Sequence, residues 1–459
     1  MSDIPLMFQA AIPERGKIQY IGDKEKAYNW VEQWRKGLAP NVPQFPSNVC
    51  TKDYRIAWRF LTDSGQDNSV IRPVIGAKGY PYYPGASMKG GFKRLCTPEE
   101  ALRFCGKDIR RNGSVETQPG ILRFHGGYLK NAKPMDRSLV DLTHEQQGWQ
   151  VKETEKHSAN ILISLYEPTF VFGMSSREEL DEETWTRIWQ IWEKAIARGI
   201  GSRTSAGYGS IKKREKSDRH LLSVQLIGQG VASKLLDGTP EFRPNMFKAA
   251  LRGHTLRLFG GATDEATAEA LTKELWGGFA GQRSIVGLLA IDFNSPPGEP
   301  TLLNDYLYRN TSIPTYEFAE KPGVLNLQYT KPLSDEERKN LGRLTTRLIK
   351  FTLLLGGFGK SWRRVDHRLV FPEYTNRKQG NIHANPLIGC HWKFASSSEK
   401  LYVPIQELGD ITAFLESLQT TILNWLKYKK KSAMENGTSW REAWHPGKVQ
   451  VWGRIASCL

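Results

Sequence analysis

The chain has 459 residues, of which 39% are hydrophobic and 11% aromatic, enough to build folded domains without disulfides and to exclude a largely disordered protein. Lysine and arginine (64) outnumber aspartate and glutamate (48), and the net charge of +16 favours a polyanionic partner such as nucleic acid. No stretch approaches the roughly 18 apolar residues of a membrane-spanning helix, and residues 1–16 lack a secretory h-region. We therefore expect a cytoplasmic protein without a membrane partner.

The cysteines argue against disulfide bonds and against a structural metal. The five are an odd, scattered set without a C-x-x-C pair, which is neither a disulfide framework nor a zinc ribbon. His383, Cys390 and His391 lie close together in sequence, but their spacing fits no usual zinc pattern. We expect these three to be packing residues.

Two related segments combine a proline, small residues and positive charge at the start of a helix. The first, residues 82–96, reads YYPGASMKGGFKRLC, and the second, residues 242–254, reads FRPNMFKAALRGH. Both run from a proline through small residues to a lysine and then to a basic, apolar helix. A strand-like stretch follows in each half, GILRF in the first and GLLAIDF in the second. The shared order indicates an internal repeat.

A second pair of features follows in the same order. Each half has an amphipathic helix with an acidic start, and each helix ends in a glycine-rich loop, at residues 197–213 and 354–368. The spacing between the proline segment and the loop is nearly the same in both halves. We infer a tandem duplication with its boundary near residues 216–220. The predicted apolar stripes are Trp185, Ile188, Trp189, Trp192 and Ile196 in the first helix, and Leu341, Leu344, Leu348, Phe351 and Leu355 in the second.

The glycine-rich loops allow two interpretations. Glycine lets backbone N–H groups approach a polyanion closely, and the neighbouring Ser, Thr, Arg and Lys add donors and charge, which favours phosphate binding. Glycine also commonly ends a helix, and for residues 199–202 alone an ordinary C-cap is the commoner explanation. The second loop contains GKS, but Leu354 stands where a Walker A motif has its first glycine and a helix precedes the loop, which argues against a P-loop NTPase.

Together and in this order, the two motifs resemble those of the RAMP superfamily, RNA-binding proteins of CRISPR systems. Residues 80–95, YPYYPGASMKGGFKRL, are similar to its Pro-Gly-Ser-Ser-x-Lys-Gly segment, and residues 199–211, GIGSRTSAGYGSI, to its glycine-rich loop. Residues 67–90 resemble the backbone subunits of type III effector complexes, in which an Asp-x-Pro-Val-Ile run precedes that segment. A duplicated subunit in one chain resembles the fused backbone proteins of type III-D variants.

The resemblance implies an α+β fold of two tandem modified ferredoxin-like (RRM-like) domains, residues 1–218 and a degenerate copy at residues 219–459. Each domain would carry a hairpin thumb, at about residues 126–157 and 294–323, and the second an insertion at about residues 380–445. The polar, Pro-containing thumb segments could equally be plain surface loops. Because the chain lacks the RRM aromatic signature, we expect binding of the RNA backbone rather than base stacking on an open sheet.

The resemblance also implies partners: a guide CRISPR RNA, a target RNA, and other RAMP-type and large subunits of an antiviral ribonucleoprotein. In the first half, the helix start after Pro84 and the glycine-rich loop would hold phosphates. The second half keeps donors and charge in an altered geometry, and Trp362 would stack on a base or ribose. The predicted RNA-binding residues are Ser87, Lys89, Lys93, Arg94, Gly199, Gly201, Ser202, Arg203, Thr204, Ser205, Tyr208, Arg243, Lys248, Arg252, Gly357, Gly359, Lys360, Ser361, Trp362, Arg363 and Arg364.

The resemblance places catalysis at Asp67, which matches the aspartate that type III backbone subunits use to cut target RNA. A single carboxylate can hold Mg²⁺ or another divalent cation against the substrate phosphate, or orient a ribose 2′-hydroxyl. The surrounding SGQDNS is also ordinary turn chemistry. Asp237 is the weaker second candidate, because its DG context is itself a turn signature.

We therefore expect a metal-dependent endoribonuclease that cuts target RNA within the complex. Two alternatives stay open. One is a scaffold subunit that binds RNA while another subunit cuts, and the other is a generic basic RNA-binding protein outside CRISPR systems.

Overall fold

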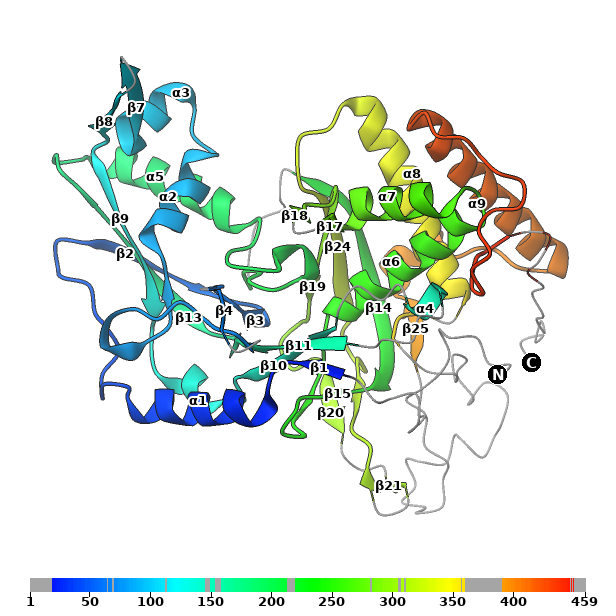
Figure 1. Ribbon diagram of the computed structural model, residues 1–459, viewed down its shortest axis with the longest axis horizontal. Coiled ribbons are helices and arrows are strands. Elements are labelled where there is room, and N and C mark those ends of the chain that lie inside the picture. Colours follow the sequence, from blue (N-terminus) through cyan, green and yellow to red (C-terminus); the bar gives the residue numbers. More distant parts are fainter. Residues whose placement is uncertain are drawn as a thin grey trace.

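Helices and mainly antiparallel sheets alternate along the chain (Figure 1), which confirms the predicted α+β class. No helix among the described residues is long and apolar enough to cross a membrane. The computed structural model describes residues 19–63, 65–67, 70–111, 114–144, 149–152, 158–212, 219–280, 283–303, 307–308, 311–355, 357–359, 390–445, 447 and 449.

A four-stranded antiparallel sheet forms the centre of the first half. Two helices pack against each other beside it, α2 (Gly85–Lys93) and α5 (Glu182–Ile196). The Trp192 ring of α5 lies 5.1 Å from the Phe172 ring of the sheet, so the predicted apolar stripe of this helix faces the core. The strand order is β2 (Cys50–Arg55), β13 (Thr169–Ser176), β9 (Leu122–Leu129) and β6 (Tyr82–Tyr83).

Shorter elements complete the first half. Strand β11 (Ser158–Ile163) pairs in parallel with β1 and β5 and antiparallel with β10. Helix α1 (Lys24–Lys36) packs against β10 and β11. The remaining elements are β1 (Gln19–Ile21), β3 (Arg59–Phe60), β4 (Gln66–Asp67), β5 (Val70–Ile71), α3 (Pro98–Glu100), β7 (Gly106–Arg111), β8 (Ser114–Pro119), β10 (Val140–His144), α4 (Trp149–Lys152) and β12 (Leu165–Tyr166).

The second half is built on the long strand β14 (His220–Val231). Leu226 of β14 pairs with β24 on one edge and with β25 on the other, and every neighbouring pair in this sheet is antiparallel. The sheet order is therefore β19, β24, β14, β25. Strand β23 pairs with the C-terminal end of β14, and β20 pairs with β23. These strands are β19 (Leu289–Asn294), β20 (Thr301–Leu303), β23 (Thr315–Glu317), β24 (Gly323–Tyr329) and β25 (His391–Phe394).

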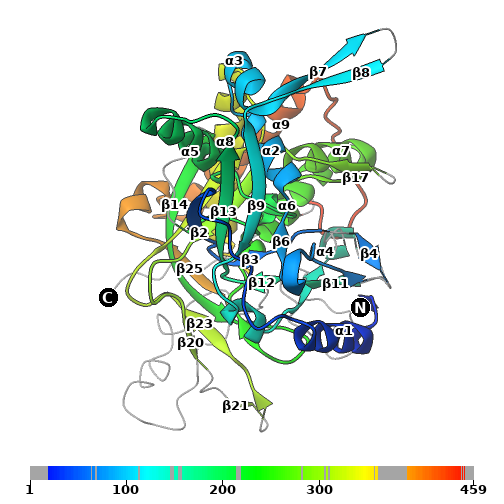
Figure 2. The ribbon, with the colours of Figure 1, turned by 90° about the vertical axis from the view of Figure 1, so that its left-hand side faces the viewer.

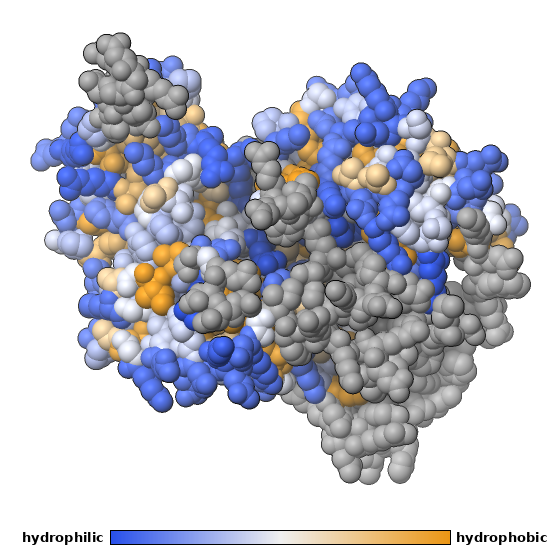
Figure 3. All heavy atoms as spheres, viewed as in Figure 1, coloured by the Kyte–Doolittle hydropathy of each residue, from blue (hydrophilic) through white to orange (hydrophobic). Residues whose placement is uncertain are grey.

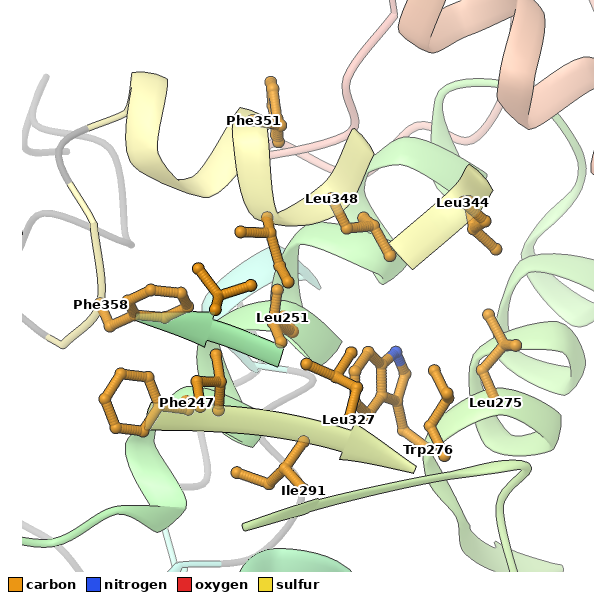
Figure 4. Close-up of a cluster of buried hydrophobic side chains, with 14 of the residues drawn as sticks. Phe247, Leu251, Leu275, Trp276, Ile291, Leu327, Leu344, Leu348, Phe351 and Phe358 are labelled. Atoms are coloured by element: carbon orange, nitrogen blue, oxygen red, sulfur yellow. The ribbon is translucent and has the colours of Figure 1, made fainter. Parts of the chain in front are cut away.

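Four helices cover this second sheet and bury its apolar side (Figures 1 and 4). They are α6 (Asn245–Gly260), α7 (Glu265–Trp276), α8 (Asp335–Leu354) and α9 (Leu408–Tyr428). Figure 4 shows Phe247 and Leu251 of α6, Trp276 of α7 and Leu348 of α8 pointing toward one another above the sheet. The stripe predicted for α8 is confirmed at Leu341, Leu344, Leu348 and Phe351, which are all fully buried, whereas Leu355 caps the helix and is partly buried.

The two predicted thumb segments have different structures. In the first, at residues 126–157, β10 pairs with β11 and α4 contacts α6 of the second half. In the second, at residues 294–323, β20 pairs with β23 and a small hairpin continues outward from them, formed by β21 (Leu307–Tyr308) and β22 (Thr311–Ser312). Figure 2 shows this hairpin and the β7–β8 hairpin projecting at opposite ends of the molecule. Both thumb assignments stay predictions.

The buried apolar residues form two main clusters, one drawn from residues 27–211 and the other from residues 224–426. The predicted domain boundary lies between these clusters, partly at residues 213–218, which are outside the described residues. The segment predicted as a C-terminal insertion, residues 380–445, supplies β25 to the sheet of the second half and α9 to the second core. The domain limits themselves stay a prediction.

A buried network of opposite charges joins the two halves. Arg59 of β3 donates three hydrogen bonds to Glu241, including one of 2.7 Å from Nη2 to Oε2. Arg243 Nη1 lies 2.7 Å from Oδ1 of Asp141, and the hydroxyl of Tyr208 donates to the other oxygen of Asp141 at 2.8 Å. All five side chains are buried. Burial alone would raise the pKa of Asp141, but Arg243 and Arg59 beside it hold this pKa below its ordinary value.

Replacing Glu241 by glutamine should strongly destabilise the protein. The change leaves the buried Arg59 guanidinium without its opposite charge, and breaking a buried ion pair in this way costs about 3–5 kcal/mol. The matched control is Glu32→Gln in the exposed pair Glu32–Lys36, where the cost should be about 0–1 kcal/mol. Urea unfolding measures both, and equal midpoints for the two variants would contradict the assigned role of the network.

Candidate nucleic-acid interface

The start of α2 brings the first proline segment close to the central sheet. Pro84 has extended backbone angles before the helix, and a Cβ on Gly85 would lie only 2.1 Å from the carbonyl oxygen of Phe124. Glycine at this position therefore lets α2 approach β9. Ser87 and Arg94, both exposed, lie two turns apart on one face of α2, whereas Lys89 and Lys93 point to another. Lys93 Nζ donates to the carbonyl of Gly106 at 3.5 Å.

The first glycine-rich loop is held against β3. Gly199 N–H donates to the carbonyl of Ile196, so the expected helix cap is present, but the loop continues beyond it. The N–H of Ser202 donates to the carbonyl of Leu61 at 2.7 Å, and a Cβ on Gly201 would lie 2.3 Å from the same oxygen. Arg203, with φ of +58°, then turns the chain into a short 3-10 turn, η5 (Thr204–Ala206). The loop combines a helix cap with a fixed, close-packed backbone.

The second proline segment contacts this first loop directly. Lys248, on the first turns of α6, donates from Nζ to Oγ of Ser205 at 2.7 Å. Arg252 lies one turn further along the same face of α6. The turn η5 also packs on β19 of the second half. The structure therefore brings together the second copy of the segment and the glycine-rich loop of the first half.

These elements line one groove of about 1780 Å³ between the two halves. In Figure 3 the molecule is hollowed between its two lobes, and the walls of the hollow are largely hydrophilic. Among the described residues, the lining holds ten arginines and lysines but one carboxylate, Asp63. Even with Arg243 paired to Asp141 and Arg257 to Glu442, the lining keeps a clear positive excess. The ten are Arg94, Arg198, Arg203, Arg219, Lys234, Arg243, Lys248, Arg252, Arg257 and Lys331.

Several of these cations lie in an environment that disfavours their charge. Burial, together with Arg252 and Arg203, lowers the pKa of Lys248 to about 8. Burial lowers the pKa of Arg252 to about 10. Arg243 has the opposite behaviour, because Asp141 and Glu241 outweigh its burial and raise its pKa. Within the groove, Asp141 and Glu241 therefore balance the positive charge of Arg243, whereas positive charge is in excess around Lys248.

The structure gathers most of the predicted RNA-binding residues at this groove. Tyr208 lines the groove as well, but its side chain is fully buried and its hydroxyl donates to Asp141, so it also belongs to the buried network. Lys89, Lys93 and Gly357 do not line the groove, and residues 360–364 lie outside the described residues. The predicted residues that line it are Ser87, Arg94, Gly199, Gly201, Ser202, Arg203, Thr204, Ser205, Tyr208, Arg243, Lys248, Arg252 and Gly359.

The two candidate catalytic residues lie on different elements of the fold. Asp67 is in the edge strand β4, where its backbone pairs with Val70 of β5, and its side chain is outside the described part of the chain. Asp237 lies in the turn between β15 (Ser233–Lys234) and β16 (Pro240–Glu241), where it accepts hydrogen bonds from Ser138 and from the N–H of Thr239. Asp237 does not line the groove, and both catalytic assignments stay predictions.

Sequence reasoning missed several residues of the groove. Asp63 lies four positions before Asp67, and its carboxylate accepts the N–H of Gly65 at 2.8 Å. Arg198 adjoins the glycine-rich loop, so proximity could have indicated it. Arg219, Lys234, Arg257 and Lys331 are scattered and carry no motif that would have singled them out.

The described residues contain no group of three or more His, Cys, Asp or Glu side chains that could hold a metal ion. Among the described residues, Cys50, Cys96, Cys105 and Cys390 are not joined in disulfide bonds. Cys390 and His391 are buried in the second half, and His383 lies outside the described residues.

No protein-family profile matches the chain, and no curated protein matches it. Among solved structures, it is similar to a chain in the cryo-EM structure of the type III-B Cmr-beta complex bound to cognate target RNA, with 18% identity over 42% of this chain and 67% of that chain and a TM-score of 0.27. It is also similar to a chain of a type IV-B CRISPR complex, with 14% identity over 37% of this chain and 93% of that chain and a TM-score of 0.25. At these scores the two likenesses do not establish a shared fold.

Replacing Lys248 by methionine should stabilise the protein at pH 7, because it removes a cation that burial and two arginines disfavour. The folded-state pKa of about 8 lies below the ordinary 10.5, so the unfolded chain binds more protons between these values and wild-type stability rises with pH there. The expected gain at pH 7 is about 1–3 kcal/mol. Thermal unfolding at pH 7 and pH 9.5 measures it, with the exposed Lys36→Met as control. A lower melting temperature for Lys248→Met would show that the charge stabilises the fold.

Proposed function

We propose that this chain is an RNA-binding subunit of a ribonucleoprotein and that it holds the sugar-phosphate backbone of RNA in the groove between its halves. The observation that carries the proposal is the charge of that groove, ten cations against one carboxylate among the described lining residues. RNA phosphates supply the negative charge that this lining lacks. The backbone-approaching glycines and hydroxyls of the loop are suited to phosphate and ribose rather than to a particular base.

We further propose that each half is a modified ferredoxin-like domain. Support comes from the second half, where α6 and α7 connect β14 to β19, α8 follows β24, and the sheet order is β25, β14, β24, β19. This is the β-α-β-β-α-β arrangement with helices on one face. In the first half, β2, β13 and β9 have the same relative order, α2 lies between β2 and β9, and a single bridge from Ile56 to Ile211 stands at the fourth strand position.

The partners we propose are those of a type III CRISPR effector complex. The proposal rests on the resemblance of residues 80–95 and 199–211 to the RAMP superfamily, together with the convergence of both segments on one cationic groove. The groove would hold the guide CRISPR RNA, with the target RNA paired to it. Neighbouring RAMP-type and large subunits would continue the complex on either side, and the duplication makes a type III-D-like fused backbone subunit the specific candidate.

Cleavage of the target RNA at Asp67 is the catalytic part of the proposal. A divalent ion such as Mg²⁺ would have Asp67 as its protein ligand and would take the rest from phosphate and water. Such an ion supplies charge stabilisation at the phosphate that is cut. Asp67 lies in an edge strand, with its backbone paired on one side by β5. The alternative is a scaffold subunit that binds RNA without cutting it.

Asp67→Ala should abolish one cut in the target RNA and leave target binding unchanged. The measurement is cleavage of a labelled guide-complementary RNA by the reconstituted complex with magnesium. Asp63→Ala is the matched control, since Asp63 lines the groove and lies four positions away. We expect it to keep the cut.

Three outcomes separate the functions. An unchanged set of cuts with Asp67→Ala would support the alternative, a scaffold subunit that does not cut RNA. Loss of the cut with Asp63→Ala alone would indicate that Asp63, and not Asp67, is the catalytic residue. Equal affinity for unrelated RNA, without dependence on a guide or on partner subunits, would instead favour a generic RNA-binding protein.

A further inference from the structure

Two cysteines of the first half lie next to each other at the base of the β7–β8 hairpin. Cys96 follows the end of α2, and Cys105 ends η3 (Ala101–Cys105), a single π-helical turn directly before β7. Helix α2 packs on η3, and the rings of Phe92 and Phe104 lie 6.1 Å apart. Because Cys96 lies one turn after Phe92 and Cys105 adjoins Phe104, this packing brings the two thiols together, and they form a hydrogen bond.

The two thiols have opposite surroundings. The hydrogen bond with Cys96, together with Lys89 and Lys93, holds the pKa of Cys105 below its ordinary value, although Cys105 is buried. The same hydrogen bond and burial raise the pKa of Cys96, which is the more exposed of the two. A thiolate beside lysines is the reactive form of cysteine, and a neighbouring thiol can resolve its oxidised form. The pair thus combines a reactive cysteine with a resolving one.

This arrangement gives Lys89 and Lys93 a role that the groove does not give them. Neither lysine lines the groove, whereas Ser87 and Arg94 of the same helix do. Lys93 donates instead from Nζ to the carbonyl of Gly106, the residue after Cys105, at 3.5 Å. The lysines of the first proline segment therefore lie on the side of α2 that holds the cysteines.

We propose that Cys96 and Cys105 form a site of reversible oxidation, at which hydrogen peroxide converts the two thiols into a disulfide. The Cys105 thiolate attacks one peroxide oxygen, the O–O bond breaks, and the products after proton uptake are a sulfenic acid on Cys105 and one water. The sulfur of Cys96 gives up its proton, attacks the sulfenic sulfur and displaces the hydroxyl group, which leaves as a second water. Each cysteine loses one electron, the peroxide takes up both, and a thiol reductant reverses the change.

The sequence makes a direct test of this disulfide possible. Trypsin cuts after Arg103, between the two cysteines, so Cys96 and Cys105 fall in different peptides, residues 95–103 and 104–107. After treatment with hydrogen peroxide and blocking of the remaining thiols, mass spectrometry without reductant should find these two peptides linked. Before blocking, the intact oxidised chain should be about 2 Da lighter, the mass of the two lost hydrogens. Dithiothreitol should restore the mass and separate the peptides.

Four variants separate a built site from general thiol oxidation. Cys50→Ser, at a partly exposed cysteine outside the pair, should keep the linked peptides. Cys96→Ser should lose them and leave Cys105 as a sulfenic acid that dimedone labels. Lys89→Met should slow disulfide formation severalfold, because it removes positive charge beside Cys105. Lys36→Met, an exposed control on α1, should leave the rate unchanged.

Two results would overturn the proposal. The first is the absence of linked peptides from the wild-type chain under peroxide that oxidises free glutathione in the same sample. The second is dimedone labelling of Cys50 or Cys390 as fast as that of Cys105 in Cys96→Ser, which would show that the surroundings of Cys105 do not make it selectively reactive. A thermal melt of each variant before oxidation shows that the compared chains are folded. The outcome does not depend on RNA binding, because neither Cys96 nor Cys105 lines the groove.

Discussion

The buried network of Arg59, Glu241, Arg243 and Asp141 is the interaction on which the rest of the structure depends. Two arginines and two carboxylates leave no net charge, and each arginine has a partner from the other half. The geometry is stringent, because buried charges are tolerated only when they are fully paired and hydrogen-bonded. The network lies directly beneath the glycine-rich loop, since Tyr208 of the loop donates to Asp141. The separation between the loop and α6 is therefore set before any ligand binds.

A preformed groove has a consequence for binding. Under the proposed function, holding the loop and α6 in place during folding would mean that less conformational freedom is lost when RNA binds. The cost appears as unfavourable charge around Lys248, whose pKa is lowered to about 8. Under the proposed function, stability and binding are thus opposed at this residue, as is common where a site is built for a ligand rather than for the fold. This opposition between stability and binding also explains why Arg243 is paired with a carboxylate, whereas the charge of Lys248 is disfavoured.

Much of the fold could be predicted from local pattern, and the site only in part. The stripes of α5 and α8 follow from periodicity, and all their residues except Trp185 and Leu355 are buried, whereas the α+β class follows from the family resemblance. Arg59 and Glu241 are 182 positions apart in sequence, so no local signal indicated their pairing. The sequence predicts one set of RNA-binding residues in each half. The described members of the two sets meet at one groove, because the second half packs against the first glycine-rich loop. Tyr208 is predicted to bind RNA, and the sequence gives no signal that packing against Trp58 and bonding to Asp141 bury its side chain.

The central claim is that RNA lies between the two halves, and crosslinking tests it most directly. Guide RNA containing 4-thiouridine would be assembled into the complex, irradiated, and the crosslinked peptides identified by mass spectrometry. The account predicts crosslinks to residues 199–208 and to residues 245–257 in the same sample, because both segments line the groove. Crosslinks confined to other surfaces, such as α1 or α9, would contradict it.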